Sequence, residues 1–343
     1  MTIRTTPTRR RRAAFAVPLV LALTAACGGG SKADKASAAR AAPETSTSVA
    51  ATAIAPLTGL LVDPAKARRV AVAVKIDNNV EARPQAGIDH ADLVYEEYTE
   101  GITRFIVVFQ SADAPAVGPV RSVRPADPNV IMPLGGPIAF SGGSAAVLAV
   151  VKASGLRQIT ENDTGTLKRR SDRAAPHNLY TTTAALFAKA GGGAPPPAFG
   201  PFLATGQVYA PAGAAPASKL SLSPASDVTA AYVWDPASST WKRSTDGKPH
   251  MLEGGAQIAP RNIIVQYTPY TTFPADTKVR YPEVVGSGDA LIFAAGTMVK
   301  AKWSKSAPGA VTTYADSTGK PIALPPGQTW IHLLQPGSAL TSS

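Results

Sequence analysis

The chain contains a single cysteine, Cys27, whose position limits what the rest of the sequence can fold into. Five arginines with no acidic residue among them precede an apolar run, 13–23, and small residues lead from there into the cysteine. A positive stretch, an apolar stretch and small residues in this order are typical of a cleaved export signal. The apolar run is shorter than the about 20 residues that a membrane-spanning helix needs. We therefore expect residues 1–26 to be a signal peptide.

The cysteine also indicates a lipid anchor. Leu23-Thr24-Ala25-Ala26-Cys27 resembles the bacterial lipobox, whose cysteine sulfur takes a diacylglyceryl group, although Thr24 stands where leucine is usual. Two or more acyl chains, such as diacylglyceryl and palmitate, hold a protein on a membrane stably, whereas one chain is marginal. An ordinary secreted protein and a twin-arginine export route are the alternatives, and Phe15 is not spaced as the twin-arginine motif requires. We predict lipidation at Cys27 and a place on the extracytoplasmic face of the cell membrane.

Composition excludes several classes of function. The formal net charge of +11 includes the five arginines of the signal, so the mature chain carries about +6. No later basic stretch has interleaved aromatic residues, and we expect no nucleic-acid partner. A lipidated Cys27 leaves no thiol for disulfides, metal binding or nucleophilic catalysis. The four histidines are far apart in the sequence, so we expect no metal and no cofactor.

Changes in composition divide the mature chain. Residues 27–55 are rich in Gly, Ser, Ala and Thr and predict a flexible tether. A Gly/Pro-rich stretch, 191–201, predicts a boundary between a domain at 56–198 and a domain at 199–337, with a tail at 338–343.

Apolar patterns predict an α+β fold, in which a mixed α/β N-terminal domain precedes a mostly β C-terminal domain that forms a sandwich or open barrel. In the first domain we expect strands at 70–76, 92–98 and 103–109 and helices at 130–134, 144–153 and 181–190. In the second we expect strands at 228–234, 263–267, 290–293, 298–303 and 330–334.

Polar strings are concentrated in the first domain. They include Lys75-Ile76-Asp77-Asn78, Ala82-Arg83-Pro84-Gln85, Gly118-Pro119-Val120-Arg121-Ser122-Val123-Arg124, Ser141-Gly142-Gly143-Ser144 and Ala175-Pro176-His177-Asn178. Together with Asp246-Gly247-Lys248-Pro249-His250 and Pro326-Gly327-Gln328-Thr329-Trp330, they resemble the YerB-like family of bacterial lipoproteins over about 56–334. The resemblance implies an envelope lipoprotein with N-terminal and C-terminal subdomains. It supplies no reaction and no functional residue.

Arginines are the strongest candidates for ligand binding, because the guanidinium group holds carboxylates or phosphates through two hydrogen bonds. We predict that Arg121 and Arg124, which flank Ser122, form an anion-binding patch with Arg83 or Arg104 near Asp77 and His177. Ser141, Ser144 and Asn178 are further candidate ligand-binding residues. The alternative is internal pairing with acidic residues such as Glu96 and Glu100.

Catalytic interpretations rest on weaker patterns. Asp77, Glu96 and His177 are candidate catalytic residues. Asp92 and Glu96 on one strand face would be about 13 Å apart, too far for a glycosidase pair, and a Ser144–His177–Asp172 triad has no supporting motif. The four tryptophans predict β-core packing, with a sugar-stacking platform as the alternative.

Three hypotheses therefore stand. The first is a lipid-anchored binding or accessory protein for an anionic wall polymer or an envelope protein. The second is a hydrolase acting on peptidoglycan or a wall polysaccharide, and the third is a structural assembly partner. The sequence contains no recognised catalytic constellation, so it leaves open whether the protein is an enzyme.

Overall fold

The computed structural model describes residues 51–225 and 228–343. The predicted signal peptide, Cys27 and the tether up to residue 50 lie outside the described residues. Within the predicted tether, β1 (Ala53–Ile54) pairs with β2 (Leu61–Val62), so the folded part begins earlier than the expected residue 56. Apolar residues on both sides of a turn that ends at Gly59 make this pairing, and Ala55 beside it is fully buried.

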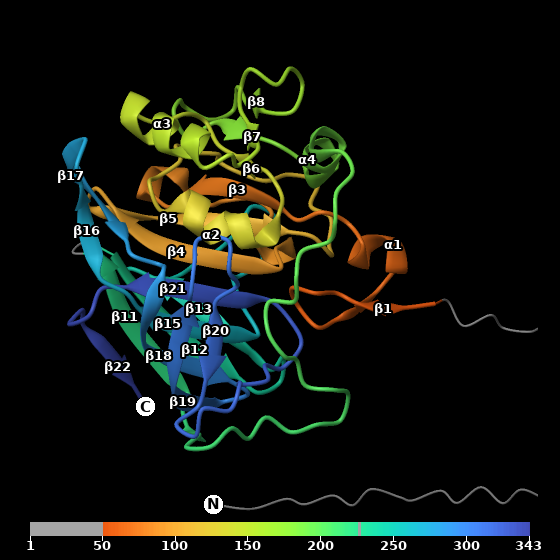
Figure 1. Cartoon of the computed structure of the whole chain (residues 1–343), viewed down its shortest axis with the longest axis vertical. Coiled ribbons are helices and arrows are strands. Elements are labelled where there is room, and N and C mark those ends of the chain that lie inside the picture. The colour runs from red at the N-terminus through yellow and green to blue at the C-terminus, as the bar shows by residue number, and fades with distance from the viewer. Residues whose placement is uncertain (1–50, 226–227) are drawn as a thin grey trace, which may run out of the picture. The chain divides into compact units, whose positions relative to one another are not determined.

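One large sheet runs through the molecule and takes strands from both predicted domains (Figure 1). β21, from the second domain, lies between β15 and β4 and is parallel to both. The path of the sheet is β10 (Ala215–Pro216), β19 (Thr297–Lys305), β18 (Gly286–Ala294), β15 (Asn262–Tyr267), β21 (Thr329–Leu334), β4 (Leu93–Thr99), β5 (Ile102–Phe109), β3 (Val72–Asp77), β6 (Ile138–Ala139) and β7 (Gln158–Ile159), with β20 (Thr313–Ala315) beside β19.

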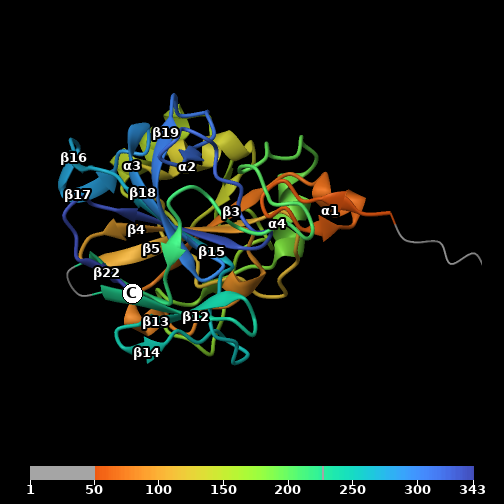
Figure 2. The ribbon, with the colours of Figure 1, turned by 90° about the horizontal axis from the view of Figure 1, so that it is seen from below.

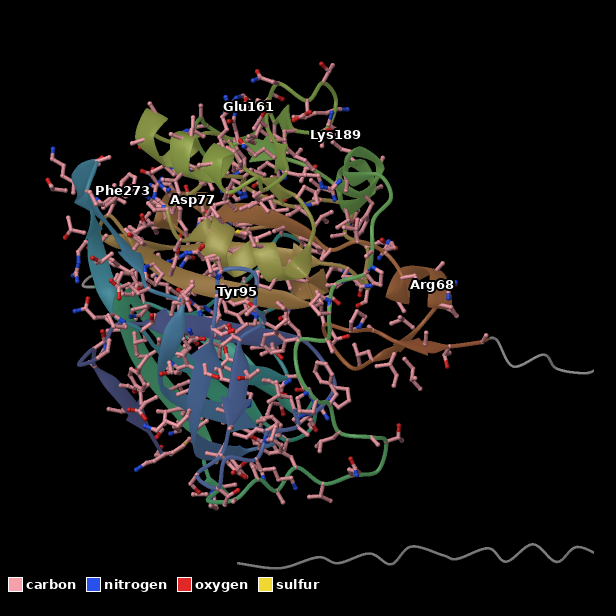
Figure 3. All side chains as sticks on the ribbon, viewed as in Figure 1. Arg68, Asp77, Tyr95, Glu161, Lys189 and Phe273 are labelled. Carbon is pink, nitrogen blue, oxygen red and sulfur yellow. The ribbon has the colours of Figure 1, made fainter. Side chains whose placement is uncertain are left out.

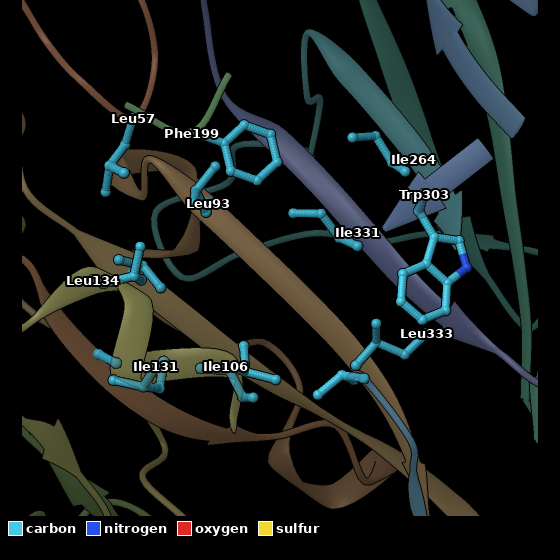
Figure 4. Packing of buried hydrophobic residues seen from close by; sticks show 14 of the residues in the cluster. Leu57, Leu93, Ile106, Ile131, Leu134, Phe199, Ile264, Trp303, Ile331 and Leu333 are labelled. Atoms are coloured by element: carbon cyan, nitrogen blue, oxygen red, sulfur yellow. The ribbon is translucent and has the colours of Figure 1, made fainter. Parts of the chain in front are cut away.

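Helices cover the part of this sheet that comes from the first domain. α2 and α3 pack on one face through Ile131 and Val151, which belong to the same apolar cluster as Ile106. Figure 4 shows Ile131 beside Ile106. α4 packs on the other face through Leu186. The helices are α1 (Pro64–Ala67), α2 (Asp127–Ile131), α3 (Ala145–Ala153) and α4 (Thr183–Ala190), with short 3-10 turns at Val80–Ala82, Ile88–His90 and Met132–Leu134.

A second, smaller sheet packs on the face opposite α2 and α3 (Figure 2). Its Tyr232 and Trp241 join Ile263, Val265 and Phe293 of the large sheet in one apolar cluster. Its order is β14 (Lys248–Pro249), β13 (Thr240–Thr245), β12 (Val228–Asp235), β11 (Lys219–Ala225) and β22 (Leu340–Ser342). Two further pairs complete the strands, β16 (Tyr270–Phe273) with β17 (Asp276–Pro282) and β8 (Lys168–Arg169) with β9 (Leu179–Tyr180).

Most predicted elements are present, but the predicted division of the fold is only partly visible. In the described residues all α-helices precede Gly191 and only strands follow it. The two segments nevertheless share one sheet, because β21 and β4 are both apolar strands that need neighbours on each side. The residue boundaries of the two domains therefore remain a prediction about the sequence. Trp241, Trp303 and Trp330 are buried, which favours packing over sugar stacking.

Candidate functional site

Two polar groups lie on opposite faces of the large sheet. Successive residues of a strand point to opposite faces, so the neighbours Glu96 and Glu97 on β4 lie on different sides of the sheet. We call the group on the α2 side the arginine cluster; it comprises Asp77, Glu100, Arg104, Arg121, Arg124 and His177. We call the group facing the second sheet the core network; it comprises Gln85, Glu96, Tyr232, Arg243, His250 and His332.

Asp77 is the residue of the arginine cluster that contacts both Arg121 and His177. It ends β3 and is fully buried (Figure 3). Its Oδ2 accepts a hydrogen bond from Arg121 Nε at 2.8 Å and lies 2.9 Å from His177 Nδ1. The other ring nitrogen of His177 is 3.1 Å from Glu81 Oε2, so the imidazole lies between two carboxylates. The structure thus brings together Asp77, Arg121 and His177, which the sequence analysis placed in one site. Asp77 and His177 are 100 positions apart in the sequence.

A loop runs alongside β3 and fixes Arg121. The Arg121 amide donates to Lys75 O, and the Asp77 amide donates to Pro119 O at 3.0 Å. Val120 is bonded on its other side to Leu179 O at 2.7 Å. Gly118 permits this close approach, because a Cβ there would lie 2.6 Å from the Tyr180 ring. The loop is therefore clamped on both sides and holds the Arg121 backbone in place.

Arg104 is the least satisfied member of the arginine cluster. On β5 it lies directly opposite Asp77 on one side and Glu97 on the other. Asp77 is already engaged by Arg121 and His177, and Glu97 by Lys75. The guanidinium donates only to Ser122 O at 3.3 Å, lies 3.9 Å from Glu100, and its Nε has no partner among the described residues.

Burial and the neighbouring arginines both lower the pKa of Arg104. The residue is only 4% exposed. Burial, followed by the positive charges of Arg124 and Arg121, lowers the pKa of Arg104 to about 10 against the attraction of Asp77 and Glu100. A desolvated guanidinium is costly unless charged or polar partners compensate for the lost water. This position therefore favours an additional anion.

Arg124 closes the outer side of the cluster. It donates to Thr99 Oγ1 at 2.7 Å and to Glu100 Oε2 at 2.5 Å, and its side chain is largely buried. The string 141–144 adjoins this loop, because the Ser141 amide donates to Arg121 O and the Val123 amide donates to Gly142 O. Ser122 and Ser141 are partly exposed beside Arg121.

A buried triad of charges lies behind the arginine cluster. Lys75 donates to Glu97 and, at 2.8 Å, to Asp127 Oδ1. Asp127 also accepts from the Arg124 amide, which ties the triad to the cluster. Burial raises the pKa of Glu97 to about 7. The positive charge of Lys75 acts to lower this pKa, but the negative charge of Asp127 opposes it. These three residues were not predicted from the sequence, although a lysine inside a strand expected to be buried was a detectable signal.

The core network pairs its charged groups more closely by comparison, although His332 Nδ1 makes no aligned hydrogen bond among the described residues. Arg243 donates to both Glu96 oxygens at 2.9 and 3.1 Å, and to Tyr232 Oη. His332 lies between Tyr232 Oη at 2.9 Å and Glu96 Oε2 at 3.1 Å. Burial alone would raise the pKa of Glu96, but Arg243 and His332 hold it well below its ordinary value. Burial and Arg243 lower the pKa of His250 to about 2, so this histidine is neutral.

The remaining predicted residues lie outside the arginine cluster. Glu96 belongs to the core network, where strand alternation places it on the other face from Asp77. Arg83 donates to Asn78 and to Asp246 Oδ2 at 2.9 Å, so Arg104 and not Arg83 accompanies Arg121 and Arg124. Asn178 bonds Arg169 Nη1 at 2.8 Å and Arg170 O, which makes it part of a turn.

The Ser144–His177–Asp172 triad has none of its hydrogen bonds in the described residues. Ser144 Oγ accepts from the Val147 amide at 3.4 Å and is the N-cap of α3. Asp172 pairs with Arg170 at 2.5 Å, and His177 pairs with Asp77 instead. Helix capping explains Ser144 because serine commonly accepts a hydrogen bond from the first turn.

Metal chemistry and membrane spanning find no support in the part of the chain that the structure describes. No group of three histidine or acidic residues there is arranged to hold a metal ion. Within 51–225 and 228–343, no helix has the length and apolar character needed to cross a membrane. The arginine cluster can instead hold an anion through guanidinium groups, since such pairs are the strong hydrogen bonds of proteins.

Comparison with known proteins identifies the family. A family model described as "Protein of unknown function (DUF3048) N-terminal domain" matches residues 57–194, and the corresponding C-terminal domain matches residues 220–331. The chain is 29% identical to "Putative lipoprotein YerB" of Bacillus subtilis (strain 168) over 288 residues, which cover 82% of this chain and 86% of that protein.

A solved structure shows the same fold. The crystal structure of YerB protein from Bacillus subtilis matches with a TM-score of 0.73 and 25% identity, over 84% of this chain and 99% of that one. The two family models match in the expected order and confirm the resemblance found in the sequence. The chain therefore belongs to the DUF3048 family and contains both its N-terminal and its C-terminal domain.

Proposed function

We propose that this protein is a lipid-anchored envelope protein that binds an anionic ligand through Arg104, Arg121 and Arg124. The ligand belongs to the carboxylate- or phosphate-bearing components of the cell wall, or to an acidic surface of an envelope protein. The lipid anchor rests on the lipobox-like sequence that ends at Cys27 and on the similarity to a protein named as a lipoprotein.

Arg104 carries the binding proposal. Two carboxylates lie across from it on neighbouring strands, yet each is engaged by other cations, and Arg104 keeps one unpartnered nitrogen among the described residues. If the cluster only stabilised the fold, a direct pair between Arg104 and one of these carboxylates would cost less free energy than a buried Arg104 with an unpartnered nitrogen. An anion that enters beside the partly exposed Arg121 supplies the missing partner.

The test compares binding with stability. Arg104→Met removes the charge but keeps the volume, and the control Arg169→Met removes an exposed arginine paired with Glu161. Soluble muropeptides with free carboxylates and glycerol-phosphate oligomers are titrated into each protein by calorimetry. We expect Arg104→Met to lose binding while its free energy of unfolding stays equal or rises, because it removes a poorly compensated buried charge.

Two other results have clear meanings. A fall of about 3 kcal/mol in the stability of Arg104→Met, with no binding by the unmutated protein, would assign Arg104 to the scaffold. Binding that is equally weakened by Arg169→Met would show a general charge effect. The hydrolase hypothesis lacks a hydroxyl nucleophile bonded to His177 among the described residues, so no observation favours it as a second candidate.

A further inference from the structure

The first hairpin of the folded part exposes apolar side chains. Ile54 is 66% exposed, Leu61 is 63% exposed and Leu60 is 43% exposed. Among the described residues, every exposed large aliphatic side chain outside this hairpin is a valine or a methionine, so all exposed isoleucine and leucine side chains gather here. Single exposed apolar residues need no explanation, but a group of them marks an interaction surface.

The hairpin geometry places these side chains together. Ile54 and Leu61 are direct cross-strand partners in the β1–β2 pair. Residues opposite each other in an antiparallel pair lie on the same face, with Cβ atoms about 5 Å apart. The pair therefore presents one apolar surface, which the described residues leave uncovered.

Basic side chains adjoin the apolar surface. α1 follows the hairpin directly, and Arg68 at its end is exposed. Lys66 and Arg69 share a single acidic partner, Asp113. Apolar groups beside a net positive charge are the combination that binds the interface of an anionic bilayer.

The position of the hairpin in the chain indicates that the surface it contacts is the membrane. Cys27 precedes Ala51 by 24 residues, so a lipid on Cys27 keeps the hairpin within at most about 85 Å of the bilayer. No other part of the folded chain is closer to the anchor along the sequence. β3 then carries the chain away from α1 to Asp77, and Figure 3 shows Arg68 at the right edge of the folded part and Asp77 inside it, left of the centre.

We infer that the hairpin β1–β2 and α1 rest on the surface of an anionic membrane. This contact orients the folded part so that the arginine cluster points away from the bilayer, toward the wall. The inference rests on the proposed lipid anchor, but it concerns a separate surface, one that contributes no residue to the arginine cluster.

The test uses the acylated full chain in vesicles of phosphatidylglycerol and phosphatidylethanolamine. Because Cys27 is the only cysteine and its sulfur is acylated, one engineered thiol can be labelled alone. Ile54→Cys, Leu61→Cys and the control Val233→Cys, which is 50% exposed on β12, each receive an environment-sensitive fluorophore. Iodide in the water and spin-labelled lipid in the bilayer then quench the fluorescence.

We expect labels at positions 54 and 61 to be quenched by the lipid and to show a severalfold lower iodide quenching constant than the label at 233. Adding Arg68→Glu should return the iodide quenching constant at 54 toward that of 233. Equal iodide quenching at all three positions on vesicle-bound protein would overturn the inference.

Two further outcomes distinguish membrane contact from dimerisation and from a missing anchor. Protection that disappears at one protein per vesicle would indicate a second copy on the hairpin and would also overturn the inference. Protein that fails to float with the vesicles because Cys27 carries no lipid would refute the anchor. In that case, a Cys27→Ala protein labelled at position 54 and added to the same vesicles still tests the hairpin, since flotation with a protected label supports the inference and an unprotected label counts against it.

Discussion

The core network and the arginine cluster are built from the same kinds of residue but are completed differently. In the core network one arginine meets one carboxylate through two hydrogen bonds, and histidines and a tyrosine surround the pair. In the arginine cluster three guanidinium groups share Asp77 and Glu100, and one guanidinium nitrogen has no partner in the described part.

The two regions also differ in which parts of the chain they join. The core network connects Glu96 of the first segment with Tyr232, Arg243 and His332 of the second. Every member of the arginine cluster, from Asp77 to His177, comes from the first segment. A matched pair buried between two segments holds them together, whereas the under-partnered arginines lie within one segment and are the groups that we propose bind a ligand. Mutations in the two regions should therefore have different consequences.

The largest effect is expected from breaking the core network. Arg243→Met leaves the Glu96 carboxylate buried without its main partner, which should lower the free energy of unfolding by about 3–5 kcal/mol. Urea unfolding followed by circular dichroism measures the change. Adding Glu96→Gln should restore part of the loss, because the uncompensated charge is then gone. A loss below about 1 kcal/mol would show that the core network does not hold the two segments together.

A smaller, pH-dependent effect is expected behind the arginine cluster. The pKa of Glu97 is raised from 4.5 to about 7 in the folded state, so the folded chain binds this proton more tightly than the unfolded chain. Its contribution to stability is therefore complete below pH 4.5 and is lost as the pH rises to about 7. At 1.36 kcal/mol per pKa unit, the loss is at most about 3 kcal/mol.

Glu97→Gln should flatten this part of the stability curve. Unfolding free energies measured between about pH 4.5 and 8 should fall less steeply for the variant than for the unmutated protein. Glu161→Gln, which removes an exposed carboxylate, is the control. Parallel curves for Glu97→Gln and the unmutated protein would mean that Glu97 keeps its charge in the folded state.

The sequence predicted much of the local structure but little of how the parts are joined. Apolar and β-branched runs located β3, β4, β5 and the helix that begins beside Ser144, because these patterns depend on neighbours in the chain. The insertion of β21 between β15 and β4 depends on contacts between β21 and β4, which are more than 200 residues apart and which no local pattern encodes. The Glu96–Arg243 pair was missed for the same reason.

The candidate site was predicted in part. The spacing of Arg121 and Arg124 in a loop started by Gly118-Pro119 indicated a shared surface. The structure pairs Arg121 with Asp77 and brings both arginines close enough to lower the pKa of Arg104. The choice between Arg83 and Arg104 required knowing that Asp77 and Arg104 are opposite each other on paired strands. The role of Ser144 required knowing where α3 begins, because a serine at a helix start caps the helix.

A modest effect is expected at Ser144. Ser144→Ala removes the N-cap of α3 and should lower the free energy of unfolding by about 0.5–1 kcal/mol without changing anion binding. Ser144→Thr keeps a capping hydroxyl and serves as the control. Lost binding with unchanged stability would return Ser144 to the ligand site and widen the arginine cluster to include the loop 141–144.

The smallest effect on stability is expected from cutting the chain between the two segments. Residues 191–201 are mostly exposed and contain no helix or strand, so a protease should cleave there first. Because the core network and the pairing of β21 with β4 hold the segments together, the two fragments should elute as one particle in gel filtration and keep anion binding. In Arg243→Met, which loses the buried pair but keeps the pairing of β21 with β4, the cut fragments should separate at a lower urea concentration than those of the unmutated protein. Fragments of the unmutated protein that separate after cleavage would show that the segments are independent domains. The core network would then not be what holds them together.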